Sequence, residues 1–285
     1  MSSQKFTVTQ KNDIQTLLGL IADKLRISKN KAKQLLDKRH VFVNKKRVWI
    51  ASYQLQKGDI VEVAINDTEP FNFTSKSERT GYEEVNILFH DDFYLIVSKP
   101  PYLLTNGANS LESHLRERFN NSQIQAVHRL DRDTSGAVIF AMDKDAFERM
   151  KSMFKNNLVK KVYRTMVQGN VEKQTFTINT PIQGQRAITH VKTLKKGPIA
   201  SYLEVMIETG RTHQIRIHLA SVGHPVIGER EYNRKPINNP LMRQPARQML
   251  HSYQIAVTHP YTQKTISISA DIPEDFLQCL KNLGL

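Results

Sequence analysis

The sequence predicts two α+β domains, a small basic domain followed by a larger one built around an extensive sheet. Two observations lead to this prediction. The chain has 285 residues, which is longer than a common single domain. Its first part places two helix-like segments before short strands, whereas later strand-like segments outnumber helices without alternating regularly with them. We therefore place the small domain at residues 1–65, a linker at 66–84 and the larger domain at 85–285.

The small domain is predicted to hold two helices and a small sheet. Apolar residues recur at helical spacing from Ile14 to Leu25, which indicates an amphipathic helix. A second helix is expected over residues 29–38, with Ser28 as its N-cap. Strands are expected at residues 41–43, 48–50 and 60–63, the first two joined by a hairpin-like connection over 44–47.

The larger domain is predicted to be built around an antiparallel or mixed sheet flanked by helices. It follows a segment rich in Thr, Ser and Asn, which is typical of a linker. Strand patterns occur at residues 94–97, 137–142, 162–167, 188–194, 201–207, 253–258 and 265–270. Helical patterns occur at residues 110–119, 146–154 and 214–221. Strands that outnumber helices without regular alternation favour an α+β arrangement.

The charge of the chain favours a polyanionic partner. Forty-one Lys plus Arg residues against 27 Asp plus Glu leave a formal net charge of +14. Between Lys24 and Arg47 there are ten Lys or Arg residues and one acid, Asp37. A solvated surface would explain such a run, but its concentration on one small domain favours binding to nucleic acid. The residues expected to contact RNA phosphates there are Lys29, Lys31, Lys33, Lys38, Arg39, Lys45, Lys46 and Arg47.

Residues 128–136, with the sequence His-Arg-Leu-Asp-Arg-Asp-Thr-Ser-Gly, place two aspartates between arginines just before an apolar strand. One explanation is a surface turn with local ion pairs. The other is catalysis, because neighbouring arginines favour the ionised form of a buried carboxylate, which can then attack an electrophile. The residue pattern by itself leaves both explanations open.

A second polar segment leads from the end of a strand into a predicted helix. His213 and His218 are five residues apart, which is not the spacing of two zinc ligands on one helix face, so we treat both as structural groups. Arg211 and Arg216 are better candidates for a site, because a guanidinium can hold a carboxylate through two hydrogen bonds. One of these arginines is expected to hold Asp131.

Tyr163 follows two lysines at the start of a predicted strand. A tyrosine in a strand usually packs in the core or at its rim. If its ring lines a pocket near Asp131, it can instead stack on an extruded base, an interaction that contributes about 1–3 kcal/mol.

These segments together resemble the RluA-like pseudouridine synthases, and the resemblance extends over nearly the whole chain. Residues 128–136 are similar to the catalytic-aspartate motif of that family, and residues 209–220 are similar to its second signature. Smaller blocks follow in the expected order at Lys99-Pro100, residues 161–163, residues 223–228 and Leu250-His251. The first 65 residues resemble the αL-type RNA-binding module of a small-subunit ribosomal protein. The resemblance implies a pseudouridine synthase domain behind an RNA-binding domain.

The resemblance also implies roles for individual residues. Asp131 would be the essential nucleophile, Tyr163 the active-site aromatic residue and Arg216 the guanidinium paired with the aspartate. Arg129 would help to hold the RNA near the extruded base. The family usually has a glycine at the second position after its Lys-Pro pair, whereas this chain has Tyr102. We expect that departure to affect the local shape of the pocket.

An enzyme of this kind isomerises uridine in structured RNA to pseudouridine after flipping the nucleotide out of its stack. Asp131 would either attack the ribose C1′ or remove a proton from C2′, and both routes stay open. We expect no cofactor and no metal, because we find no phosphate loop, no dinucleotide-binding glycine pattern and no multi-cysteine zinc motif.

Ribosomal RNA is the expected substrate, and transfer RNA is the alternative. A non-catalytic RNA-binding or ribosome-assembly protein and a hydrolytic RNA glycosylase are the competing functions. We expect a monomer without a membrane partner, since no stretch approaches the roughly 20 apolar residues of a membrane span. A single cysteine, Cys279, and the lack of an apolar signal core at the N-terminus favour the cytoplasm.

Overall fold

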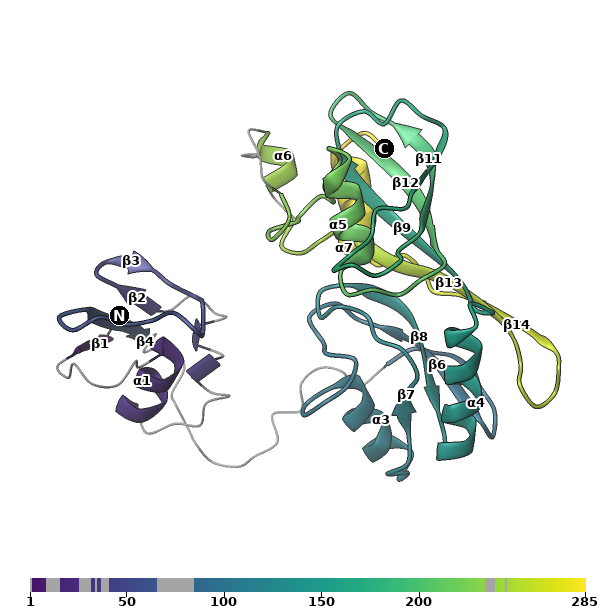
Figure 1. Ribbon diagram of the computed structural model, residues 1–285, viewed down its shortest axis with the longest axis horizontal. Helices are drawn as coiled ribbons and strands as arrows, with labels where there is room; N and C mark the ends of the chain where they lie inside the picture. Colours follow the sequence, from purple (N-terminus) through teal and green to yellow (C-terminus); the bar gives the residue numbers. More distant parts are fainter. Residues whose placement is uncertain are drawn as a thin grey trace. The chain divides into compact units, whose positions relative to one another are not determined.

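A computed structural model gives the fold of the chain in two compact units, Met1–Glu78 and Arg79–Leu285, each of which is described by itself (Figure 1). The structure describes residues 2–8, 16–25, 32–33, 35–36, 41–65, 85–233, 239–243 and 245–285. The predicted linker at 66–84 lies outside the described residues. The predicted α+β class is confirmed.

The N-terminal unit packs helical residues against a four-stranded antiparallel sheet in the order β1-β4-β2-β3. Its elements are β1 (Ser2–Thr7), α1 (Leu17–Lys24), β2 (Val41–Val43), β3 (Lys46–Arg47) and β4 (Ile60–Ile65). Thr16 caps α1, because its Oγ1 accepts a hydrogen bond from the Gly19 N–H at 3.2 Å. Within the predicted second helix, residues 32–33 and 35–36 are helical, and Ala32 and Leu36 are buried in the core.

The hairpin of this unit is tighter than predicted. The strand expected at 48–50 is wrong, because the pairing strand is Lys46–Arg47 and the turn consists of Asn44 and Lys45 alone. Both turn residues have positive φ angles, of 50° and 65°, as a two-residue hairpin turn requires. The pairing therefore ends before Trp49 and Ile50, and both side chains are about half exposed.

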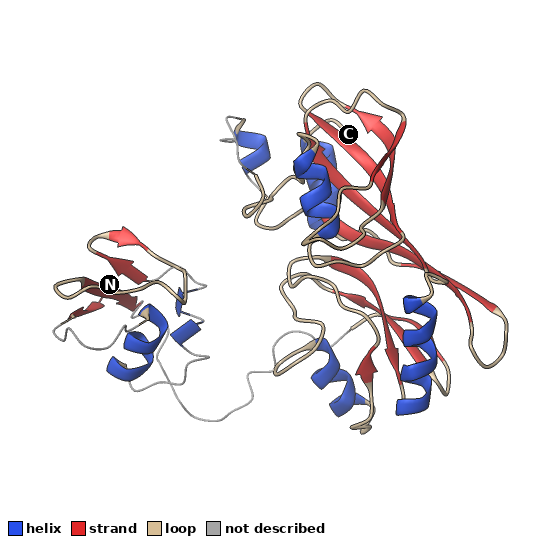
Figure 2. Cartoon of the chain, in the orientation of Figure 1, coloured by secondary structure: helices blue, strands red, loops and turns tan. Residues whose placement is uncertain are grey.

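The larger unit is built on a ten-stranded sheet in the order β10-β11-β12-β9-β13-β8-β6-β5, with β14 paired to β13 and β7 to β8 (Figure 2). Its strands are β5 (Ile87–His90), β6 (Tyr94–Lys99), β7 (Gln125–Ala126), β8 (Ser135–Ala141), β9 (Lys160–Gln168), β10 (Thr175–Ile178), β11 (Thr189–Lys196), β12 (Ala200–Ile207), β13 (Leu250–Thr258) and β14 (Thr265–Ser269). Each of the seven predicted strands and three predicted helices of this unit is present, whereas β5, β7, β10, α6 and α7 were not predicted.

Helices cover both faces of this sheet. Helices α3 (Leu111–Arg118) and α5 (Gln214–Ser221) pack on the face that carries Val138 and Phe140 of β8. The opposite face is covered by α4 (Lys144–Lys155) and α7 (Glu274–Asn282). Every residue of β8 is buried as a result. A short helix, α6 (Pro240–Arg243), precedes β13, and no helix of the described residues is long and apolar enough to cross a membrane.

Strands β13 and β8 pair in parallel, which makes the sheet mixed. They share only two residue pairs, His251 with Ser135 and Ser252 with Gly136. Gly136 has a φ of 110°, and a Cβ atom there would lie 2.2 Å from the Ser252 carbonyl oxygen. A glycine therefore allows the backbones to approach at the end of residues 128–136.

We expect Gly136→Ala to lower the free energy of unfolding by about 3 kcal/mol, because the new methyl group meets backbone and the left-handed φ strains an L residue. Urea unfolding measures the change. The control is Gly210→Ala, whose Cβ would meet no atom within 4 Å. Equal stabilities of the two variants would contradict the close approach at Gly136.

Candidate active site

A pocket lies beside the junction of β8 and β13. The loop before β8 contributes Asp131, β9 contributes Tyr163, and the start of α5 contributes Arg216. The three residues predicted to act together thus line one pocket. Its full lining is Arg129, Leu130, Asp131, Thr134, Tyr163, Ile207, Gly210, Arg211, His213, Gln214, Ile215, Arg216 and Leu250. Among these lining residues, which the structure describes, Asp131 is the single acid.

Hydrogen bonds fix the loop that carries Asp131. Thr105 Oγ1 donates to the Leu130 carbonyl and accepts from the Leu130 N–H, both at 3.1 Å. The Thr134 N–H donates to the Asp131 carbonyl, closing a turn around the aspartate. Lys99 Nζ donates to the Arg132 carbonyl at 2.9 Å. The backbone of the loop is therefore held on both sides of Asp131, and 24% of the Asp131 side chain stays exposed.

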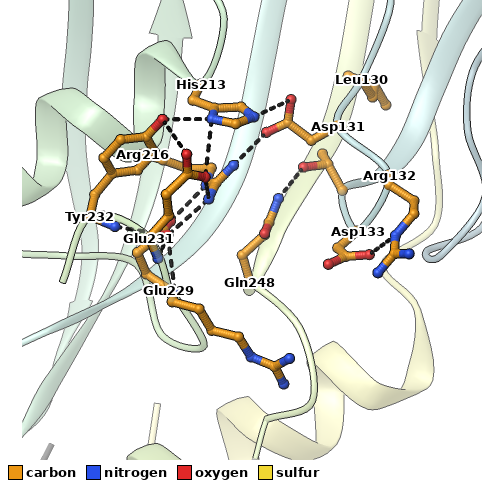
Figure 3. A network of polar contacts seen from close by, with 12 residues as sticks. Leu130, Asp131, Arg132, Asp133, His213, Arg216, Glu229, Glu231, Tyr232 and Gln248 are labelled. Atoms are coloured by element: carbon orange, nitrogen blue, oxygen red, sulfur yellow. Dashed lines mark hydrogen bonds and ion pairs between the residues drawn. The ribbon is translucent and has the colours of Figure 1, made fainter. Parts of the chain in front are cut away.

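Arg216 is the centre of a buried charge network (Figure 3). Its guanidinium donates from Nη1 to Asp131 Oδ2 at 3.2 Å, from Nε to Glu229 Oε2 at 2.6 Å and from Nη2 to Glu229 Oε1 at 2.8 Å. Nη2 also contacts Glu231 at 3.1 Å. The Arg216 side chain is only 7% exposed and that of Glu229 is fully buried. The guanidinium thus contacts three carboxylates from two separate segments, and Asp131 is one of them, as predicted.

Both members of the buried pair are held in their charged forms. Burial alone would lower the pKa of Arg216, but hydrogen bonds and charge from Glu229 and Asp131 raise it above its ordinary value. Burial likewise opposes ionisation of Glu229, but the bond from Arg216 lowers its pKa overall. The Glu231 and Tyr232 N–H groups help, since they donate to Glu229 Oε1 at 2.8 and 3.3 Å.

Tyr163 forms part of the core and of the pocket wall. Its ring is buried in the cluster that includes Val205 and Leu250. Burial, and then the charge of Asp131, raises the pKa of the Tyr163 hydroxyl well above its ordinary value. The phenol therefore stays protonated at neutral pH and presents an uncharged ring beside Asp131.

Three arginines were predicted near the site, and one of them holds Asp131. Arg129 is exposed and lines the pocket. Arg211 also lines it, but its Nε donates to the Arg186 carbonyl at 3.1 Å, so Arg216 is the one that holds Asp131.

The predicted RNA-binding residues of the N-terminal unit are described only in part. Lys33 and Lys45 are exposed, and Lys46 and Arg47 form β3. Lys29, Lys31, Lys38 and Arg39 lie outside the described residues.

His213 is a site residue that sequence reasoning missed. It was predicted to be structural, as His218 is, whose buried ring contacts Thr189 Oγ1 and the Thr180 carbonyl. His213 instead lines the pocket with a φ of 56°, its Nε2 3.6 Å from Asp131 Oδ1 and its Nδ1 2.7 Å from the Tyr232 hydroxyl. Its position in the sequence between Arg211 and Arg216, the two candidate arginines, could have indicated that it lies at the site.

Glu229 and Tyr232 were also missed. The signal for them was weak, because an acid that follows Gly228 has no spacing relation to Arg216 in the sequence. Only the fold brings the two charges together.

The arrangement provides one carboxylate that lines a pocket next to an aromatic ring and is held by a buried guanidinium. Such a carboxylate can act as a nucleophile or as a base. The part of the chain that the structure describes contains no group of three or more His, Cys, Asp or Glu side chains that could hold a metal ion.

Comparison with known proteins finds relatives that cover most of the chain. The family described as RNA pseudouridylate synthase matches residues 93–221, and the S4 domain matches residues 21–61. An uncharacterized RNA pseudouridine synthase of Bacillus subtilis (strain 168) is 31% identical, with 97% of this chain and 94% of that protein covered. Ribosomal large subunit pseudouridine synthase C of Vibrio cholerae is 29% identical, with 90% and 89% covered.

Among solved structures, human RNA pseudouridylate synthase domain containing 1 is similar to this chain. It is 25% identical with a TM-score of 0.58, and the match covers 69% of this chain and 88% of the human protein.

We expect Glu229→Gln to lower the free energy of unfolding at pH 7 by about 3 kcal/mol, because it removes a charged partner from the buried Arg216. The folded state lowers the pKa of Glu229, so its contribution is complete above the ordinary value of 4.5 and decreases as the pH falls through the lowered pKa. Urea unfolding of both proteins between pH 7 and 3.5 tests this. The difference should narrow below about 4.5, and a difference that widens in acid would refute the assignment.

Proposed function

This chain belongs to the RNA pseudouridylate synthase family and is an RNA pseudouridine synthase, and from that premise we propose that Asp131 initiates the isomerisation of uridines in ribosomal RNA. One observation carries the proposal. The Asp131 carboxylate faces a pocket beside the Tyr163 ring while Arg216 holds one of its oxygens at 3.2 Å.

The target uridine first leaves its stack, at a cost of a few kcal/mol, because its glycosidic bond is hidden in folded RNA. Asp131 then either attacks C1′ or removes the proton from C2′, and in both cases the C1′–N1 bond breaks and uracil leaves as an anion. The base turns and C5 bonds to C1′, which regenerates the carboxylate or returns the C2′ proton. Loss of the C5 proton and protonation of N1 complete the isomerisation without any external reactant.

The pocket fits the demands of this sequence. Uracil leaves with its charge delocalised over the ring, so the second carboxylate that most glycosidases use is not needed. The neutral Tyr163 ring covers the detached base on one side and limits hydrolysis by water. Arg129 at the exposed edge contacts the backbone of the extruded nucleotide.

Ribosomal RNA is the proposed substrate for two reasons. The relative from Vibrio cholerae is named a ribosomal large subunit pseudouridine synthase. The S4 domain match falls on the most basic part of the chain, whose lysines suit broad contact with phosphates. Transfer RNA is the second candidate substrate. We further propose that the protein acts as a monomer in the cytoplasm and requires no added cofactor.

We expect the protein to release tritium from RNA labelled at uridine C5, because C5 must lose its hydrogen. Asp131→Asn should reduce the rate at least 1,000-fold, roughly the contribution of a catalytic nucleophile. Release is counted with ribosomal RNA and transfer RNA in parallel, in the presence of a metal chelator. The matched control is Asp145→Asn on α4, since Asp145 pairs with exposed Arg149 at 2.8 Å and should keep its activity.

Product analysis separates the competing functions. Free uracil with an abasic RNA would indicate a glycosylase, and RNA binding without any tritium release would indicate a non-catalytic protein. Full activity of Asp131→Asn would rule out the role proposed for Asp131. A kinetic isotope effect from deuterium at C2′ distinguishes deprotonation at C2′ from attack at C1′.

We expect Lys33→Ala and Lys45→Ala each to weaken RNA binding and to reduce the slope of log Kd against log salt concentration by roughly 1, because each exposed lysine neutralises one phosphate. Filter-binding measurements of Kd at salt concentrations from about 50 to about 300 mM provide the slope. Lys264→Ala, an exposed lysine of the larger unit, is the control. Unchanged slopes for both lysines of the N-terminal unit would exclude them from the interface.

A further inference from the structure

We propose that the ring of Tyr102 is a stacking platform for a nucleobase of the RNA strand adjacent to the target uridine, at the rim of the active site. The inference rests on the proposed function, since it assigns a second contact to the same substrate. It follows from the backbone conformation of Tyr102, from its exposure and from the charged groups around it.

Tyr102 adopts a backbone conformation that a tyrosine rarely takes. Its φ is 68°, in the left-handed region, directly after Pro101. A turn with proline at its second position and a positive φ at its third ordinarily takes glycine or asparagine there. Strained residues of this kind persist where the surrounding structure imposes the conformation, and they concentrate at functional sites.

The surrounding hydrogen bonds impose this turn. Lys99 is fully buried, and its Nζ donates to the carbonyls of Pro100 and Leu103, both at 2.8 Å, and to that of Arg132 at 2.9 Å. The Lys99 amino group therefore closes the turn and ties it to the loop that carries Asp131. Residue 102 lies at the apex of a turn attached to the catalytic loop.

The side chain of Tyr102 points away from the core. Exposed and buried side chains alternate along this segment. Tyr102 is 47% exposed and Leu104 is also exposed, whereas Leu103 and Thr105 are buried. Core packing therefore does not explain an aromatic residue at this strained position. A glycine would form the same turn without strain, so the ring has a use outside the fold.

The charges around Tyr102 indicate what the ring contacts. Its hydroxyl lies within electrostatic reach of Arg247, Asp275, Asp133 and Arg230. Three of these, Asp133, Arg230 and Arg247, also line a hollow whose lining includes Asp131. The hollow therefore shares three of its lining residues with the charged surroundings of Tyr102.

An aromatic ring beside exposed arginines is the combination that single-stranded nucleic acid sites use, in which cations contact phosphates and rings stack on bases. Arg132 and Arg230 are exposed on this side, and Arg230 lines the hollow. An RNA strand with its uridine in the pocket has to continue past Asp131, and this charged hollow gives its neighbouring nucleotide a place.

The test compares Tyr102→Gly and Tyr102→Phe with the unchanged protein on a transcript of large-subunit ribosomal RNA. We expect Tyr102→Gly to weaken RNA affinity, and to raise KM, about tenfold, the typical loss of one base stack, with kcat maintained. Its melting temperature should not fall, because glycine takes the left-handed conformation freely. Tyr102→Phe should retain the affinity of the unchanged protein, since the ring is kept.

Two further measurements separate stacking from other roles. The slope of log Kd against log salt should be the same for Tyr102→Gly and the unchanged protein, because a stack releases no counterions. The control is Gln263→Gly, which removes the backbone strain at another exposed residue with a positive φ, of 59°, in the β13–β14 hairpin. It should leave RNA affinity unchanged.

Unchanged affinity of Tyr102→Gly, or an equal loss in Tyr102→Phe, would overturn the inference. The affinity measurements test the stacking contact independently of catalysis. If no tritium is released, the proposed function fails, but the RNA affinities of the Tyr102 variants still show whether the ring contacts RNA. Normal isomerisation with unchanged affinity of Tyr102→Gly would leave the proposed function intact and exclude the stacking contact.

Discussion

The site depends on one buried positive charge. Arg216 is almost fully enclosed, and an enclosed guanidinium is stable only when carboxylates satisfy it, because an unpaired buried charge costs several kcal/mol. Glu229 provides the main compensation through two short hydrogen bonds, and three backbone N–H groups fix Glu229 in turn. The helix α5, the segment after Gly228 and the loop before β8 therefore meet at a single group.

This division of contacts has a chemical consequence for Asp131. Glu229 takes the Nε and Nη2 edge of Arg216, so the arginine is held in place without help from Asp131. The remaining Nη1 orients Asp131 through Oδ2 alone. The other oxygen, Oδ1, lies 3.6 Å from His213 Nε2, which is beyond hydrogen-bond distance. A carboxylate with one oxygen fixed and one oxygen toward the pocket is oriented for reaction yet keeps a lone pair available.

Much of this fold followed from local pattern, and the failures have physical causes. Strand β8 was predicted because its apolar run is long, and β12 because apolar residues alternate along it, whereas β7 and β10 have only two and four residues and gain their order from neighbouring strands. In the site, Asp131 and Arg216 were found through their motifs. Glu229 could not be found, since its role exists only once the fold places it against Arg216.

At position 102 the sequence showed an unusual residue but not where its side chain lies. The departure from glycine was visible in the sequence, and we expected it to alter the pocket. The structure instead places Tyr102 outside the lining of the pocket that holds Tyr163, in a turn where its φ is 68°. Lys99 maintains the shape of that turn through backbone carbonyls, which are the same for any residue. The side chain at such a position can vary while the loop that carries Asp131, which the same Lys99 side chain holds through the Arg132 carbonyl, stays in place.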